Sequence, residues 1–174
     1  HVNYQANSWE TGNVDDTFHF FNPKAGLNFA INENNNLYFS YARANREPNR
    51  TDYEGGSVKP ESLNDFELGW RYGTAKTKLN VNAYYMAYKD QLVLTGQLDD
   101  VGAPIRANSG DSYRLGLEID AAVAVLDKLI FRPNVTLSMN KNKDFVFQRD
   151  GELQNLGDTN IAYSPNLIAG NMVI

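Results

Sequence analysis

YRLGLEIDAAVAVLDKLIFRPNVTLSM, residues 113–139, is the stretch that decides the fold. Every second residue from Tyr113 to Val125, and again from Leu129 to Met139, is apolar, and most of the residues between them are polar or charged. Successive side chains of a strand point to opposite faces, so each run predicts one apolar and one polar face. Ordinary strands have about 5–6 residues, whereas strands that cross a bilayer need about 9–11. The stretch therefore predicts two membrane-spanning strands, joined at 126–128 by a turn that Asp127 marks.

The composition excludes several classes of protein. The chain has 174 residues, a net charge of −5 and no cysteine, which argues against a nucleic-acid partner, disulfides and cysteine–zinc sites. The longest apolar run, 121–126, is far shorter than a transmembrane helix. The N-terminus has no signal-peptide pattern, so we expect a protein that is not exported, or a mature or excised segment. His1 and His19 lie far apart, and no phosphate loop, nucleophile elbow or HExxH motif occurs, so we predict no metal site, no cofactor and no enzyme.

Alternating apolar and polar residues recur along the rest of the chain. They predict an all-β fold, an antiparallel up-and-down meander of about seven long strands. The expected strands cover residues 18–31, 37–44, 63–72, 79–87, 113–126, 129–139 and 161–174. Residues 1–17 are polar and mixed, and we expect them to form a loop or the approach to a strand.

The connections between these strands alternate in length. Short ones lie at 32–36, 73–77 and 126–128, and long polar ones at 45–60, 95–111 and 141–159. Short turns at one end and long loops at the other are typical of outer-membrane barrels. A soluble β-sandwich would have shorter strands and less regular loops.

Six short phrases, in order from about residue 20 onward, resemble those of TonB-dependent outer-membrane receptors. The most specific begins at Lys59-Pro60-Glu61, continues to Glu67 and Gly69, and matches the pattern K-P-E-x-x-x-x-x-E-x-G. The other five are Pro23-Lys24-Ala25-Gly26-Leu27, Tyr38-Phe39-Ser40-Tyr41-Ala42, Tyr88-Lys89-Asp90-Gln91-Leu92 after Tyr84-Tyr85, Asn108-Ser109-Gly110 with Gly116-Leu117-Glu118, and Ser164-Pro165-Asn166. Each phrase is weak alone, but their common order is specific.

The resemblance implies a 22-stranded barrel that is closed by an N-terminal plug domain and preceded by a TonB box. Residues 1–174 would then be a partial β-barrel domain from the later half of such a receptor, without the plug domain, the TonB box and the final strands. It implies a location in the outer membrane of a Gram-negative bacterium. The implied function is to bind a scarce nutrient (siderophore-iron, cobalamin or a saccharide) and to import it with energy from TonB. The implied partners are outer-membrane lipid, the TonB system through the missing plug, and a small ligand such as a metal chelate.

The long loop 45–60 holds the candidate ligand-binding residues. Its arginines could make charge-assisted hydrogen bonds to an anionic iron chelate. The candidates are Arg46, Arg50, Asp52 and Tyr53. Glu47, Asp52 and Glu54 offset the arginines, so a solvated loop of mixed charge is the competing interpretation.

The charged residues of the polar strand faces are candidates for the lumen of the barrel. There they could hold the plug or line the path of the substrate, and their mixed signs suggest that they pair with one another. These residues are Glu67, Arg71, Arg114, Glu118, Asp120 and Arg132. The competing interpretation is that any lumen wall is polar.

Aromatic and acidic residues also have plain interpretations. We expect aromatic residues near strand ends to form interfacial girdles: Tyr41, Trp70, Tyr72, Tyr85, Tyr88 and Tyr113. Calcium could bind the acidic groups of the third long loop, but no ordered spacing supports it: Asp144, Asp150, Glu152 and Asp158.

Three alternatives to an energised transporter remain open. A passive porin or adhesin-type outer-membrane barrel, without energy coupling, would share the strand pattern but not the plug domain. An outer-membrane enzyme would need a convergent His/Asp/Ser set near the loops. A soluble β-protein would need something to cover the apolar faces.

Overall fold

The structure is a computed structural model, which describes residues 2–8, 12–55, 58–99, 101–108, 110–126, 128–149 and 152–174. Strands make up most of the described chain, and the expected turn residue Asp127 lies outside the described residues. The elements are β1 (Val2–Ser8), β2 (Gly12–Phe18), β3 (Lys24–Asn32), β4 (Asn35–Arg46), the 3₁₀ helix η1 (Arg50–Gly55), β5 (Glu61–Gly73), β6 (Thr77–Lys89), β7 (Leu92–Leu98), β8 (Pro104–Asn108), β9 (Ser112–Leu126), β10 (Leu129–Asn142), β11 (Val146–Arg149), β12 (Glu152–Asn155), β13 (Thr159–Asn160) and β14 (Leu167–Val173).

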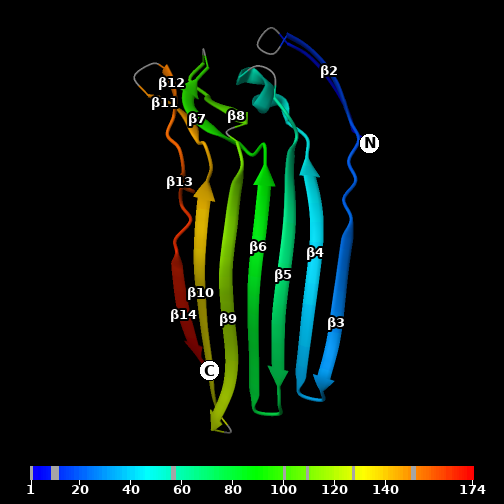
Figure 1. The fold of residues 1–174 in the computed structure, drawn as a ribbon. Coiled ribbons are helices and arrows are strands. Elements are labelled where there is room, and N and C mark those ends of the chain that lie inside the picture. Colours follow the sequence, from blue (N-terminus) through cyan, green and yellow to red (C-terminus); the bar gives the residue numbers. More distant parts are fainter. Residues whose placement is uncertain are drawn as a thin grey trace.

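One antiparallel sheet dominates the molecule. Its strands follow the order β3-β4-β5-β6-β9-β10, and both β13 and β14 pair with β10 (Figure 1). The strands β4, β5, β6, β9 and β10 have 12 to 15 residues each, which is enough to cross a bilayer. The meander that the sequence predicts is thus confirmed, as are the short turns at one end and the long connections at the other.

Strand register places the predicted apolar residues on one face. A row of paired residues runs across the whole sheet: Leu27, Phe39, Leu68, Ala83, Leu117, Leu137 and Leu167. The neighbouring row on the opposite face contains Asn28, Tyr38, Gly69, Asn82, Glu118, Thr136 and Ile168. A slip of one residue between any two strands would exchange these faces, so the register keeps the apolar surface continuous.

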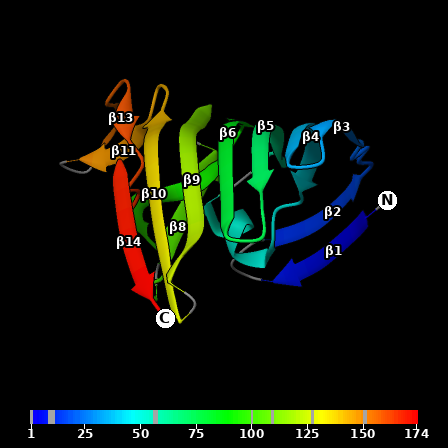
Figure 2. The ribbon, with the colours of Figure 1, turned by 90° about the horizontal axis from the view of Figure 1, so that it is seen from below.

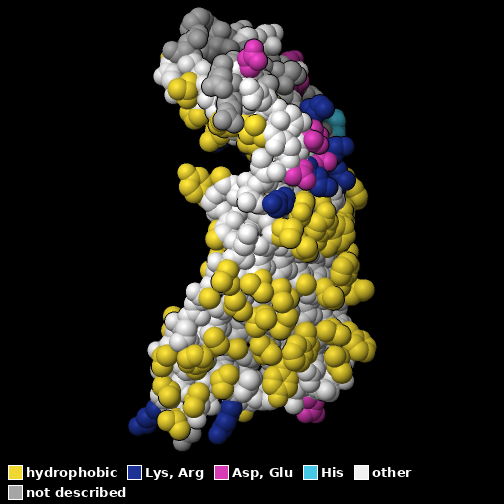
Figure 3. Space-filling model, turned by 60° about the vertical axis from the view of Figure 1, so that its left-hand side comes forward, with side chains coloured by type: hydrophobic (Ala, Val, Ile, Leu, Met, Phe, Trp, Pro, Cys, Tyr) yellow, Lys and Arg dark blue, Asp and Glu magenta, His cyan; other side chains and the backbone are white. Residues whose placement is uncertain are grey.

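Nothing among the described residues covers this apolar face. Leu27 is 74% exposed, Leu68 57% and Leu137 51%. Figure 3 shows hydrophobic side chains over the long strands, with charged side chains gathered above them and at the lower edge. The buried hydrophobic residues of the described chain are Tyr53 and Leu92, and both lie beyond the ends of the long strands. An exposed band of this kind is what lipid contact requires and what a soluble sheet avoids.

The height of the band fits a membrane. On β9 the apolar face runs from Tyr113 to Val125, twelve residues apart, or about 40 Å of extended chain. With the strand tilt of about 35–45° in such barrels, this length corresponds to a band of about 30 Å, the thickness of the hydrocarbon core. Tyr41, Phe66 and Tyr85 lie in one row near the loop end, and Trp70 and Tyr72 lie nearer the turn end. Tyr88 differs from our expectation, because it pairs with Ser112 on the polar face.

None of the helices in the described part of the chain is long and apolar enough to cross a membrane.

The segments expected as loops contain strands of their own. The polar pattern of residues 1–17 predicts a loop or the approach to a strand, but β1 and β2 form a hairpin and pair along their full length, with Tyr4 opposite Asp16 and Ala6 opposite Val14. The long connections hold the hairpins β7–β8 and β11–β12. At the tip of β7–β8, the Asp99 carboxylate accepts hydrogen bonds from the amides of Val101 and Ala103 at 2.9 and 2.7 Å. The strands of these hairpins have four to seven residues, too few to cross a bilayer, so they do not carry the pattern that predicts a wall strand.

Two wall strands begin later than expected, and in both cases a proline explains the difference. The first was expected from residue 18, but β3 begins at Lys24, directly after Pro23. The last was expected from residue 161, but β14 begins at Leu167, after a break that contains Pro165 and Tyr163 with φ +56°. Proline has no backbone N–H for the ladder and restricts the residue before it.

The sheet is curved and open. Figure 2 shows it as an arc whose two outer strands, β3 and β14, lie at opposite ends. Among the described residues, each of these strands pairs with one long neighbour only. Free strand edges invite pairing with another strand, so continuation of the wall on both sides is the natural way to satisfy them.

Two adjacent residues of β10 test which face meets lipid. We expect Leu137→Arg to destabilise the complete barrel by about 2–4 kcal/mol, because arginine at the centre of the lipid face loses its hydration. Thr136→Arg, on the opposite face, should cost less than about 1 kcal/mol. The measurement is the fraction of folded protein in outer membranes and its urea-unfolding free energy. Equal losses in both variants would contradict the assignment of the faces.

Candidate functional site

The elements at the loop end form a cap on the sheet, which we define as β1, β2, η1, β7, β8, β11 and β12 (Figure 1). The ion pairs of the described chain lie at this end of the molecule, within the cap or beside the ends of β4, β5 and β6. The cap also holds the buried hydrophobic residues Tyr53 and Leu92. These features make it the candidate site.

Asp52 is the centre of the cap. Its side chain is fully buried, and its carboxylate lies 3.6 Å from Nη1 of Arg46 and 3.7 Å from Nη1 of Arg106. Asn49 caps η1 and fixes the position of Asp52: the Asn49 amide donates to Asp52 Oδ2 at 2.9 Å, and the Asp52 amide donates to Asn49 Oδ1 at 3.1 Å. This reciprocal pair is a capping box, which the spacing Asn49-x-x-Asp52 encodes locally.

A second carboxylate extends the cluster toward the sheet. Glu61 Oε2 lies 3.4 Å from Nη2 of Arg46 and accepts a hydrogen bond from the Leu92 amide at 3.1 Å. Arg46 ends β4, Glu61 begins β5 and Leu92 begins β7. Arg46 is thus held between two carboxylates, and the cluster joins the wall to the cap.

Asn108 joins the second long connection to the first. Its side chain accepts from the Lys59 amide at 2.7 Å and donates to the carbonyls of Lys59 and Asp90, at 3.0 and 2.6 Å. Lys59 and Asp90 also approach each other at 4.0 Å. Asn108 therefore holds the end of β8 against two other segments of the chain.

Tyr53 attaches the first hairpin to η1. Its hydroxyl donates to Asp16 Oδ2 at 2.7 Å, and its ring stacks on Tyr4 with centroids 5.4 Å apart. Burial, together with the hydrogen bond to Asp16, raises the pKa of the Tyr53 hydroxyl well above its ordinary value. The neutral hydroxyl therefore stabilises the folded state. This contribution to stability is fully present below about pH 10, the ordinary pKa of tyrosine, and is lost as the pH rises above it.

The candidate ligand residues thus have different surroundings. Arg46 and Asp52 lie in one cluster, and Tyr53 lies beside it facing Asp16. Arg50 begins η1 and is exposed. Asp52 offsets the charge of Arg46, but it is fully buried, so this part of the loop is not the solvated loop of the competing interpretation. The contacts of Arg106, Glu61 and Asn108 join segments that are distant in the chain, so no local sequence pattern indicates them.

The polar face carries tyrosines that lie over glycines of the next strand. Tyr38 pairs with Gly69, and Tyr84 pairs with Gly116. A Cβ atom at either glycine would overlap the tyrosine ring. The Tyr38 hydroxyl reaches one strand further and donates to Asn82 Oδ1 at 3.0 Å. Each glycine leaves the room in which an aromatic ring lies flat on the wall.

All six candidate lumen residues lie on this polar face. The register places Glu67, Arg71, Arg114, Glu118, Asp120 and Arg132 there. We expect them to pair with one another, but no ion pair joins any two of the six in the described chain, and the contacts that they make there go to neutral groups. Ser40 Oγ donates to Glu67 at 3.2 Å, and Asn80 donates to Asp120 at 3.0 Å. Arg71 and Arg114 lie over the rings of Tyr38 and Tyr88, at 4.3 and 5.3 Å.

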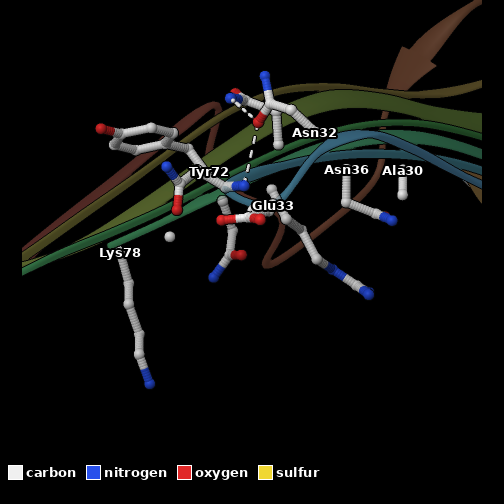
Figure 4. A pocket seen from close by; sticks show the side chains of 11 residues that line it. Ala30, Asn32, Glu33, Asn36, Tyr72 and Lys78 are labelled. Atoms are coloured by element: carbon white, nitrogen blue, oxygen red, sulfur yellow. Dashed lines mark hydrogen bonds between the residues drawn. The ribbon is translucent and has the colours of Figure 1, made fainter. Parts of the chain in front are cut away.

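A shallow polar hollow of about 450 Å³ lies at the turn end. It surrounds the β3–β4 turn, where Asn32 Oδ1 accepts hydrogen bonds from the Asn34 amide at 3.0 Å and Asn35 Nδ2 at 2.9 Å (Figure 4). In that view Lys78 extends away from Glu33. Among the described residues, no group of His, Cys, Asp or Glu could hold a metal ion, in this hollow or elsewhere. Asp150, one of the possible calcium ligands, lies outside the described residues.

Comparison with known proteins identifies the family. Residues 1–171 match the model described as TonB dependent receptor-like, beta-barrel. The chain belongs to the TonB-dependent receptor family. Members of this family are outer-membrane proteins of Gram-negative bacteria, and this chain is one of them.

Relatives within the family support this assignment. The ferric-pyoverdine 358 receptor of Pseudomonas putida is 28% identical over 108 residues, which cover 60% of this chain and 13% of the relative. The siderophore receptor PiuA of Acinetobacter baumannii has a similar fold, with a TM-score of 0.70 and 19% identity over 98% of this chain and 26% of that one. The ferric-catecholate import receptor Fiu of E. coli K12 also has a similar fold. Its TM-score is 0.66 and its identity 19%, and the match covers 92% of this chain and 23% of that one. This chain therefore spans less than a third of each.

In this TonB-dependent receptor wall, the tyrosine–glycine pairs predict that a methyl group added at the paired glycine destabilises the fold, whereas one added at a glycine outside such a pair does not. Gly69→Ala should displace the Tyr38 ring and lower the free energy of unfolding of the full-length receptor by about 1–3 kcal/mol. Gly73→Ala is the matched control on the same strand, because nothing lies within 4 Å of its added Cβ atom. Thermal unfolding in detergent measures both, and equal melting temperatures would contradict the packing described.

The attachment of the β1–β2 hairpin can be tested at Tyr53. Tyr53→Phe keeps the ring but removes a hydrogen bond to a charged group, an interaction that contributes about 1.5–3 kcal/mol. We expect amide hydrogen exchange in β1 and β2 of the full-length receptor to become about tenfold faster or more. Tyr163→Phe is the control, because Tyr163 is fully exposed. Unchanged exchange in Tyr53→Phe would mean that other contacts hold the hairpin.

Proposed function

We propose that this chain is part of the wall and the extracellular cap of a receptor that imports a metal chelate of the siderophore type. The observation that carries the proposal is the match of residues 1–171 to the TonB-dependent receptor barrel, joined to a cap of paired charged residues. We further propose that the full-length receptor contains a plug domain, a TonB box and further strands. TonB would supply the energy for import.

Two features of the described chain support this proposal. The apolar band fits the membrane and leaves the loop end with its charged cluster outside. The polar face carries both signs of charge, held to neutral neighbours rather than to one another. Such a face can offer its charges to whatever fills the barrel, and Glu67, Arg71, Arg114, Glu118, Asp120 and Arg132 are our candidates for that role.

The proposed ligand class rests on the names of relatives and on the cap. One relative is named a ferric-pyoverdine receptor, and the arginines of loop 45–60 could bind an anionic iron chelate. Cobalamin and saccharides offer few anionic groups to such a loop. We therefore propose a ferric siderophore ahead of these two nutrients, bound near Arg46, Arg50, Asp52 and Tyr53.

The test is iron uptake by cells that express the full-length receptor as their sole receptor for a given ferric siderophore. We expect uptake of radioactive iron that requires both the receptor and an intact tonB gene. A receptor-free strain is the control, and immunoblotting must show equal receptor in the outer membranes. Uptake that persists without TonB would indicate a passive barrel. No uptake of any ferric siderophore in a broad panel would contradict the proposed ligand class.

A further inference from the structure

We propose that Arg106 recognises an anionic group of the ligand and that the buried Asp52 positions it. This inference rests on the proposed function and deepens it, because it names the residue that recognises the negative charge of the chelate. Arg106 lies in β8, on the second long connection, and was not a candidate from the sequence.

The surroundings of Arg106 leave most of its donors available. Its side chain is 41% exposed, and its Nη1 atom lies 3.7 Å from Asp52 Oδ1, too far for a hydrogen bond. Among the described residues this is the one polar contact of the guanidinium, which carries five N–H donors. The ion pair therefore orients Arg106 and leaves its N–H donors available to a ligand.

Arg46 is the contrasting case within the same cluster. It contacts Asp52 through Nη1 at 3.6 Å and Glu61 through Nη2 at 3.4 Å, so two carboxylates share its charge. Glu61 is itself fixed by the Leu92 amide. We assign Arg46 to the support of the cluster and Arg106 to the ligand.

Asp52 can position Arg106 because Asp52 itself does not move freely. It is fully buried, and its Oδ2 atom accepts the Asn49 amide in the capping box. Its Oδ1 atom, which faces Arg106, has no hydrogen-bond partner. A buried carboxylate oxygen without a hydrogen bond depends on a nearby cation, so Asp52 holds the Arg106 guanidinium close.

The neighbour of Arg106 across the hairpin suits an amphipathic ligand. Leu94 pairs directly with Arg106 in the β7–β8 register and is 48% exposed. Directly opposite residues of an antiparallel pair lie on the same face. An aromatic chelating group with anionic oxygens, such as a catecholate, would place its oxygens on Arg106 and its ring on Leu94.

The experiment measures binding of two chelates to the full-length receptor in detergent: a trianionic ferric tris-catecholate and an uncharged ferric trihydroxamate. Arg106→Gln should weaken binding of the tris-catecholate about tenfold or more, because a charge-assisted hydrogen bond is lost. This loss should shrink at high salt, and binding of the uncharged chelate should not change. Lys143→Gln is the control, since it removes an exposed positive charge from the same end of the molecule and should change binding less than about twofold.

Asp52→Asn separates positioning from simple charge. Although it removes a negative charge from an anion site, we expect it to weaken binding of the tris-catecholate, because Arg106 loses the group that orients it. Tighter binding in Asp52→Asn would show that Asp52 competes with the ligand and would overturn the positioning role. Thermal unfolding of each variant must show that the receptor remains folded.

The remaining outcomes distinguish this inference from the proposed function. If the wild-type receptor binds the uncharged chelate alone, or if Arg106→Gln weakens both chelates equally, Arg106 does not recognise charge. The proposed function would survive either result. If the wild-type receptor binds neither of these nor any other ferric siderophore, the proposed function fails and this inference fails with it.

Discussion

Hydrocarbon offers the backbone no hydrogen-bond partner, and the structure of this receptor wall depends on that constraint. Each long strand must bond along its length to its neighbours, which fixes the register from β3 to β14. Once the register is fixed, every second side chain meets lipid. The row from Leu27 to Leu167 is apolar for this reason, although little packs against it in the described chain.

The two faces of the wall are therefore stabilised in different ways. The outer face gains from lipid contact and needs no complementary packing, so its side chains vary in size from Ala83 to Trp70. The inner face cannot rely on lipid, and its residues pack on one another across strands. Tyr38 and Tyr84 lie flat over Gly69 and Gly116, while the charged residues of this face contact tyrosine, serine and asparagine.

The cap follows the rules of a small soluble domain. It buries Tyr53 and Leu92. It also encloses the charged residue Asp52, and two arginines and one backbone amide compensate the cost of burying this charge. Breaking such a buried pair is costly, whereas its exposed arginines remain open to solvent. The cap can thus be rigid at its centre and able to bind anions at its surface. That combination suits the charged chelate that we propose as the ligand.

The sequence by itself determined the wall, because the alternation of apolar and polar residues is a local property. In a paired strand this alternation directly sets which side chains contact the bilayer. The sequence also indicated the family, through phrases such as Lys59-Pro60-Glu61. It did not determine the exact starts of β3 and β14, where Pro23 and Pro165 outweighed the pattern. The hairpins of the cap went unpredicted, because their strands are too short for the pattern of a wall strand. Only the tertiary structure decided that Arg106 meets Asp52 and that Asn108 meets Lys59, since those contacts arise when the paired wall brings separate loops to one end of the sheet.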